Sequence, residues 1–220
     1  IYVTNEKNEP IKIQKKADPD SSQETDMITV SAEGRIDAMP GDILTIGGGT
    51  YICKDTDGEF DLSLNAETGE IEVERGTKID VTNGNLTFAD EENGKIAVST
   101  TGNKPVQVEK SSTDGKPVVT IPSGGNAAID NGADGSAVEI KVPAGTTEKE
   151  VAINDEGDIT VELKANEKII IAGIVYTADQ DGTITVDAAT GALKENTAIE
   201  PSEEAPITVI DTESFNKENY

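Results

Sequence analysis

Two short acidic runs hold the residues whose type and spacing could bind a metal ion. "DTDG" places Asp55 and Asp57 two residues apart beside a glycine, and "DQDG" repeats this arrangement with Asp179 and Asp181. Two carboxylates at this spacing beside a glycine form half of an EF-hand calcium loop. The complete loop also needs an acid two residues before them and a glutamate at its end. A cysteine and an alanine stand near the first of these further positions, and a leucine ends the first loop. Because Asp-Gly is also a strong hairpin signal, we interpret both runs as turns and keep calcium binding as the alternative.

Three aromatic side chains near equivalent turns are the candidates for ligand binding. They are Tyr51, Phe88 and Tyr176, in a chain that has no Trp, four Tyr and three Phe. Aromatic rings supply large, flat apolar faces, so these three could form the binding surface of a carbohydrate-binding module. The same residues also fit inward positions of β-strands, and we favour packing in the core over ligand contact.

The composition removes most catalytic arrangements. The chain has no His, which is the commonest general base and a member of the Ser/His and Cys/His nucleophilic sites. The single Cys53 stands in the strand-like run "TYICK", where a thiol behaves as a small buried hydrophobe. Paired carboxylates can hydrolyse a glycosidic bond, so a glycoside hydrolase fragment stays as a third hypothesis, although no pair stands out among 43 acids. We therefore expect no enzyme.

The charge of the chain excludes two classes of partner. With 43 Asp and Glu against 18 Lys and Arg, the formal net charge is −25, which repels phosphate backbones and anionic lipid surfaces. Only Arg35 and Arg75 could supply the guanidinium forks that favour phosphate recognition. No run approaches the ~18 apolar residues of a membrane span. We expect neither nucleic-acid binding nor membrane insertion.

The elements that must position these residues are short strands. Apolar residues alternate with polar ones in runs such as "DILTIGG", "KIDVTNGNLTF", "AVEIKVP" and "DITVELK", which are rich in Val, Ile and Thr and are bounded by Gly, Asn, Asp or Pro. The one stretch of helix-friendly composition, "ATGALKENTAIEPSEEAP", is broken by Gly191 and Pro201. The sequence therefore predicts an all-β protein with little helix.

An internal repeat connects the two acidic runs. Aligning the two Asp-Gly turns brings Phe60 onto Ile184 and Leu62 onto Val186, and upstream apolar positions also correspond. The copies span residues 28–73 and 151–193, and a weaker copy lies at 85–103. One such unit cannot bury its apolar face alone, so neighbouring units must stack or pair.

The repeat leaves two architectures open. Glycines of the acidic turns recur at intervals close to the rung length of many β-solenoids: Gly34, Gly58, Gly84, Gly115, Gly135, Gly157 and Gly182. We predict repeated hairpin units that form either a solenoid-like stack, which we favour slightly, or a meandering β-sandwich. The repeat domain spans 28–200, between a connector at 1–27 that could add an edge strand and an acidic connector at 201–220.

The turn pattern resembles a group of bacterial proteins. The runs "TIGGGTYICKDTDG" and "IIAGIVYTADQDG" are similar to the β-repeat segments of secreted or cell-wall-attached surface proteins of Gram-positive, often gut-dwelling, bacteria. The resemblance implies an adhesin, a stalk or another surface module. It lies in turns, so it transfers no functional residue to this chain.

We therefore predict a non-enzymatic extracellular module that acts as a structural spacer or adhesion segment. A carbohydrate-binding module is the alternative, and its partner would be a polysaccharide or a host or extracellular-matrix protein. No cofactor is expected, apart from the calcium alternative above. We expect the excised segment to be a monomer, with its targeting signals elsewhere in a longer precursor, because "IYVTNEKNEP" lacks a signal pattern.

Overall fold

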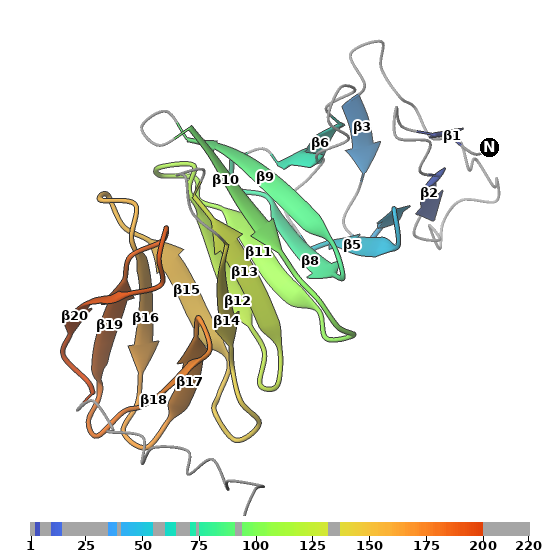
Figure 1. Ribbon diagram of the computed structural model, residues 1–220. Coiled ribbons are helices and arrows are strands. Elements are labelled where there is room, and N and C mark those ends of the chain that lie inside the picture. Colours follow the sequence, from blue (N-terminus) through green and yellow to red (C-terminus); the bar gives the residue numbers. More distant parts are fainter. Residues whose placement is uncertain are drawn as a thin grey trace, which may run out of the picture.

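The computed structural model describes residues 3–4, 10–14, 35–38, 41–54, 60–64, 71–73, 75–90, 94–131 and 137–199. Within these residues every helix or strand assigned is a β-strand, as Figure 1 shows. None of these residues belongs to a helix with the length and apolar character needed to cross a bilayer. The all-β prediction is confirmed for this part of the chain.

The described strands form two sheets, here named sheet A and sheet B. Sheet A has eleven strands, in the order β1 (Val3–Thr4), β2 (Pro10–Gln14), β4 (Ile43–Ile46), β5 (Gly49–Cys53), β8 (Lys78–Thr82), β11 (Val106–Lys110), β12 (Pro117–Ile121), β15 (Lys149–Ile153), β16 (Ile159–Leu163), β19 (Gly182–Val186) and β20 (Leu193–Asn196). Sheet B has nine, in the order β3 (Arg35–Ala38), β6 (Phe60–Leu64), β7 (Ile71–Val73), β9 (Asn85–Asp90), β10 (Gly94–Ser99), β13 (Asn126–Asp130), β14 (Val138–Lys141), β17 (Lys168–Ile171) and β18 (Ile174–Thr177).

Strand order follows chain order in both sheets. From β9 onward the chain makes a hairpin in one sheet, crosses over and makes the next hairpin in the other sheet. Figure 1 shows these hairpins side by side, from β9 and β10 in green to β19 and β20 in red. Neighbouring described strands are antiparallel except β7 and β9, because the single strand β8 lies between them in the chain and belongs to the other sheet.

The core lies between the two sheets. Along most strands whose burial is described, the buried positions alternate with more exposed ones, as in β12 and β13. This period places every second side chain on the inner face, where β-branched residues pack well. The largest fully buried side chains are Phe88, Leu44, Ile71, Ile79, Leu86, Ile96, Ile121, Ile129, Ile140 and Ile159. The structure thus supports the sandwich alternative, with sheets that do not close on themselves.

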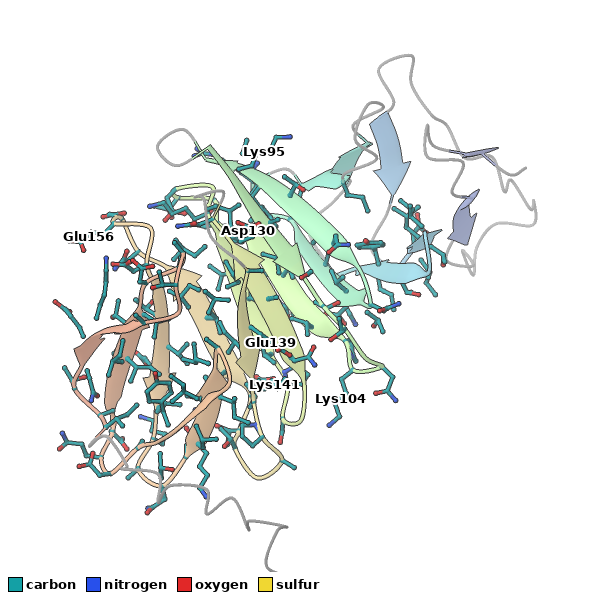
Figure 2. All side chains as sticks on the ribbon, in the orientation of Figure 1. Lys95, Lys104, Asp130, Glu139, Lys141 and Glu156 are labelled. Atoms are coloured by element: carbon teal, nitrogen blue, oxygen red, sulfur yellow. The ribbon has the colours of Figure 1, made fainter. Side chains whose placement is uncertain are left out.

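The outer faces carry much of the charge. In Figure 2, Glu139 and Lys141 lie on β14, where both side chains are exposed and their charged atoms are 3.2 Å apart. Exposed ion pairs of this kind contribute little to stability, since water solvates both groups. These residues keep the outer surface of sheet B polar and leave the apolar surface to the interior.

The internal repeat has the same strand pairing in both copies, but the sheets are exchanged. In the first copy β4 pairs with β5, and β3 with β6; in the second, β17 pairs with β18, and β16 with β19. The strands β4 and β5 belong to sheet A, whereas β17 and β18 belong to sheet B. The same strand pairings therefore form whichever of the two sheets each hairpin joins.

Candidate functional site: the stacked crossovers

The three aromatic candidates lie in the core. Phe88 is 1%, Tyr51 4% and Tyr176 9% exposed, and burial raises the pKa of the Tyr176 hydroxyl. The three rings therefore occupy inward positions of their strands, as the alternation of apolar and polar residues predicted. A sugar could stack on the rings only if the sandwich opened, so ligand binding at these residues stays a prediction without geometric support.

The second acidic run forms part of a turn contact. The Asp181 carboxylate accepts hydrogen bonds from the Ala165 N–H at 2.9 Å and from the Lys164 ammonium at 3.1 Å. These two hydrogen bonds lower the pKa of Asp181. The backbone N–H of Asp179 donates to the Ala198 carbonyl at 3.0 Å.

The calcium prediction is untested at the first run, because Asp55 and Asp57 lie outside the described residues. Within the described ranges no group of three or more His, Cys, Asp or Glu side chains is placed to hold a metal ion. The second run is not a hairpin turn, because β18 belongs to sheet B and β19 to sheet A. The contact of Asp181 with Ala165 instead joins two segments that connect one sheet to the other.

We call these connecting segments crossovers, and the Tyr51 hydroxyl holds the one between β8 and β9. The Tyr51 oxygen accepts a hydrogen bond from the Asn85 N–H at 2.8 Å and lies 3.1 Å from the Asn85 carbonyl, to which it can donate. Tyr51 belongs to β5 in sheet A, and Asn85 begins β9 in sheet B. The ring lies so close to Gly84 that a Cβ there would be 2.5 Å from the hydroxyl oxygen. This one side chain therefore links the two sheets where the chain crosses between them.

Each crossover is hydrogen-bonded to the next. Gly84 and Thr100 form two bonds: the Thr100 N–H donates to the Gly84 carbonyl at 2.9 Å, and the Gly84 N–H donates to Thr100 Oγ1 at 3.2 Å. Thr101 Oγ1 then donates to Asn126 Oδ1 at 2.9 Å. Lys104, labelled in Figure 2 beside these crossovers, donates to the Ser123 carbonyl at 2.5 Å. Three successive crossovers are joined in this way.

The same arrangement continues toward the C-terminal end. The Gly124 N–H donates to the Val142 carbonyl at 2.7 Å. Thr146 Oγ1 then bridges to the first strand of the next hairpin: it lies 2.8 Å from the Lys168 carbonyl and accepts from the Lys168 N–H at 3.1 Å. The Asn166 N–H donates to the Ala178 carbonyl at 2.7 Å. The crossovers thus form a continuous ladder of contacts between successive hairpins.

A buried ion pair stabilises one step of this ladder. Lys149, at the start of β15, pairs with Glu167 in the crossover before β17, and the two side chains are only 7% and 11% exposed. Glu167 also accepts hydrogen bonds from Thr147 Oγ1 at 2.5 Å and from the Lys164 N–H at 2.9 Å. Burial acts to raise the pKa of Glu167, but the Lys149 ammonium, Thr147 and the backbone N–H groups outweigh it and lower the pKa to about 2.

This pair predicts an acid-dependent loss of stability. The folded pKa of Glu167 is about 2 and its ordinary value is 4.5, so the stabilisation is complete above about pH 4.5 and is lost as the pH falls toward 2. A depression of this size corresponds to about 3 kcal/mol. Urea unfolding of the wild type and of Glu167→Gln should differ most above pH 5, and the difference should shrink below pH 4. A difference that does not change with pH would contradict the assignment.

The opposite end of the sandwich holds the hairpin turns. The Lys116 ammonium reaches the next turn in sheet A and donates to the Asn154 carbonyl at 3.0 Å. Lys194 pairs with the buried Asp158 at 2.8 Å. Glu156, labelled in Figure 2 in the turn between β15 and β16, lies at this end, away from Lys104. Neighbouring hairpins are therefore tied together at both ends of their strands.

A shallow concavity on the outer face of sheet A is the main candidate for a ligand surface. It has a volume of about 390 Å³ and lies over β15, β16 and β19. Ala152, Thr160 and Thr183 are among its lining residues, together with Glu148, Lys149, Glu150, Val161, Glu162 and Lys164. No aromatic ring lines it. Its three glutamates would attract a cationic group, but nothing in the lining would orient a sugar by stacking.

Sequence patterns did not identify the residues of the ladder. Thr146, Glu167 and Asn85 stand in turns where polar residues are ordinary, and their partners are distant in the sequence. The sequence does contain one indication. Lys149, Val151 and Ile153 are spaced two residues apart, and such residues of a strand point to the same face, which for β15 is the inner one.

The fold and the crossover ladder define the class of this protein as an all-β sandwich of stacked hairpins. Comparisons with protein-family models, with curated proteins and with solved structures found no match to the chain.

Proposed function

We propose that this chain is a non-enzymatic structural spacer of an extracellular bacterial surface protein. The observation that carries the proposal is that the strands follow chain order in both sheets while each crossover binds the next. Successive hairpins thus extend the sandwich in one direction, and each contacts mainly its neighbours. This is the property of solenoid-like repeat proteins, whose length is set by the number of repeats.

The dimensions suit a spacer. Neighbouring strands lie about 4.8 Å apart, so the eleven strands of sheet A extend over about 50 Å. The individual strands have two to six residues, which makes the sandwich narrow relative to this length. The net charge of −25 supports the same role, because like-charged modules repel one another and stay soluble.

The surface location and a role in adhesion depend on the resemblance of the turns to those of Gram-positive surface proteins. In this proposal the repeats hold a binding region away from the cell. The carbohydrate-binding alternative is less well supported, because its three aromatic candidates are buried.

A duplication experiment tests the spacer. Repeating residues 106–148 in tandem adds the hairpins β11–β12 and β13–β14 with their crossovers, so each sheet gains two strands. We expect the longer protein to unfold cooperatively in urea and to be longer by about 10 Å in small-angle X-ray scattering. A longer chain that fails to fold, or that folds without lengthening, would refute the spacer.

The matched control duplicates an odd number of strands. Repeating residues 117–125 adds β12 with its crossover, and a single strand carries the chain to the opposite end of the sandwich. The next crossover would then lie away from the ladder, and we expect a large loss of stability. Equal tolerance of both duplications would show that the crossover contacts do not organise the stack.

An independent test is binding of the purified chain to an array of polysaccharides and extracellular-matrix proteins, with calcium and then with a chelator. A spacer gives no saturable binding. Saturable binding that is lost in Tyr51→Ala or Tyr176→Ala, with the fold intact, would instead support a recognition module.

A further inference from the structure

The crossover between β8 and β9 consists of two residues that can react with each other. β8 ends at Thr82 and β9 begins at Asn85, so the crossover is Asn83 followed by Gly84. In an Asn-Gly sequence the glycine nitrogen can attack the side-chain amide of the asparagine, because glycine has no Cβ to obstruct the approach. Asparagine is for this reason among the thermolabile residues of proteins.

The reaction needs no enzyme and no cofactor. The Gly84 nitrogen loses its proton and bonds to Asn83 Cγ, the side-chain nitrogen leaves as ammonia, and a succinimide ring remains. Water then opens the ring at either of its carbonyl groups. One opening gives aspartate, and the other gives isoaspartate, in which the main chain runs through the former side chain and is longer by a methylene group. The net change in both cases is the uptake of water and the release of ammonia.

The ladder holds the attacking nitrogen in a hydrogen bond. The Gly84 N–H donates to Thr100 Oγ1 at 3.2 Å, and the Gly84 carbonyl accepts from the Thr100 N–H at 2.9 Å. Both residues are buried. An amide proton in a buried hydrogen bond reaches solvent only when that part of the structure opens. The Gly84 nitrogen can therefore attack only while its bond to Thr100 is broken.

The backbone of Asn83 is also held in place, although its side chain is exposed. Its φ is +51°, in the left-handed region that asparagine adopts more often than most residues. Its side-chain nitrogen lies 3.5 Å from the Gly48 carbonyl oxygen, to which it can donate. A Cβ on Gly49 would lie 2.9 Å from the Asn83 carbonyl oxygen, so this part of β5 packs closely against the crossover. Tyr51 packs equally closely against Gly84.

We propose that Asn83 is a site of spontaneous deamidation that reacts only when the step between Gly84 and Thr100 opens, and that isoaspartate then keeps this step open. The product needs room that the closed crossover lacks, because even a Cβ on Gly49 or Gly84 would lie 2.9 Å or 2.5 Å from its neighbours. A longer main chain at residue 83 therefore cannot restore both hydrogen bonds to Thr100. A transient opening of the ladder becomes permanent in this way.

Peptide mass spectrometry of the full chain, after incubation in a mildly alkaline buffer, tests the protection of Asn83. We expect Asn83 to deamidate about tenfold or more slowly in the native chain than in the chain unfolded by urea. Thr100→Val removes the acceptor of the Gly84 N–H and should raise the native rate about fivefold, which is the effect of one hydrogen bond on the opening equilibrium. The matched Thr100→Ser keeps a hydroxyl and should react at nearly the wild-type rate.

Three results would overturn this part of the proposal. Equal rates in the native and unfolded chains mean that the crossover does not protect Asn83. Equal rates in Thr100→Val and Thr100→Ser, with the Val161 amide of β16 still protected from exchange in both, mean that the bond to Thr100 is not the barrier. The wild type in low urea decides the question without a substitution: a rate at Asn83 that follows global unfolding, and does not exceed it, excludes a local opening.

The isoaspartate form, separated from the unmodified chain by chromatography, tests the effect of the product. We expect its Gly84 and Thr100 amides to exchange about tenfold or more faster than those of the wild type. Asn83→Asp is the matched control, because it carries the same charge on a main chain of normal length, and it should keep both amides protected. Fast exchange in both proteins would assign the effect to the charge. Protection in both would show that the crossover accommodates the longer chain, and either result overturns the proposed lock.

Discussion

Replacing Lys149 with methionine is expected to lower the free energy of unfolding by about 3–5 kcal/mol at pH 7. The substitution removes the ammonium that pairs with Glu167 and leaves a carboxylate that is only 11% exposed without its cation. Thr147 and the Lys164 N–H would still donate to Glu167, but hydrogen bonds replace only part of the lost attraction. Urea denaturation followed by circular dichroism measures the change.

The control for this prediction is the double variant Lys149→Met, Glu167→Met. It removes both charges, so no unpaired buried carboxylate remains, and it should recover much of the stability lost in Lys149→Met. A single variant that costs less than 1 kcal/mol would mean that water reaches the carboxylate. A double variant no more stable than the single one would indicate that the methionine side chains, and not the unpaired charge, cause the loss.

Replacing Tyr51 with alanine is expected to cost about 3–5 kcal/mol, because it removes a 4% exposed aromatic ring and leaves a cavity between the sheets. Tyr51→Phe keeps the ring and removes the hydroxyl, so it should cost about 1–3 kcal/mol through the unsatisfied Asn85 N–H. The difference between the two variants separates packing from the hydrogen bond. Thermal and urea unfolding of the three proteins provide the measurement.

Gly84→Ala supplies an independent check on the position of Tyr51. Its new Cβ would lie 2.5 Å from the Tyr51 oxygen, so the ring must move and its bond to Asn85 must lengthen. We expect a loss of stability in the wild-type background and a smaller loss in Tyr51→Ala, where the ring is absent. Equal losses in both backgrounds would show that the crossover does not depend on the tyrosine.

The Lys149 and Tyr51 variants each weaken the contacts that attach one crossover to the neighbouring strands. Tyr51 joins β5 of sheet A to the start of β9 in sheet B, and Lys149 joins β15 of sheet A to the crossover before β17 of sheet B. In a stack whose units contact mainly their neighbours, weakening one step should loosen the hairpins next to it first. Hydrogen exchange of the variants would show whether the loss spreads along the sandwich.

The local sequence pattern was sufficient to predict the strands and to detect the internal repeat. Alternation in runs such as "KIDVT" and "PVVTI" determines which side chains face inward, because successive residues of a strand point to opposite faces. Both runs are strands in the structure; Ile79, Val81, Val119 and Ile121 are buried, and Val118, on the opposite face of β12, is half-buried. The match between the segments around Tyr51 and Tyr176 was also visible in the sequence, and the structure shows equal pairing in the two copies.

Local pattern could not show which sheet a hairpin joins. Alternation is the same whether a strand pairs with one neighbour or another, so the exchange of sheets between the two copies emerges only when all pairings are formed together. The crossover ladder has the same origin, since Thr146 and Lys168, or Tyr51 and Asn85, meet only after several strands have packed. The aromatic rings were candidates for binding or for the core, and the burial of each ring depends on the opposite sheet that covers it. Periodicity is a property of neighbouring residues, whereas pairing and burial are properties of the whole sandwich.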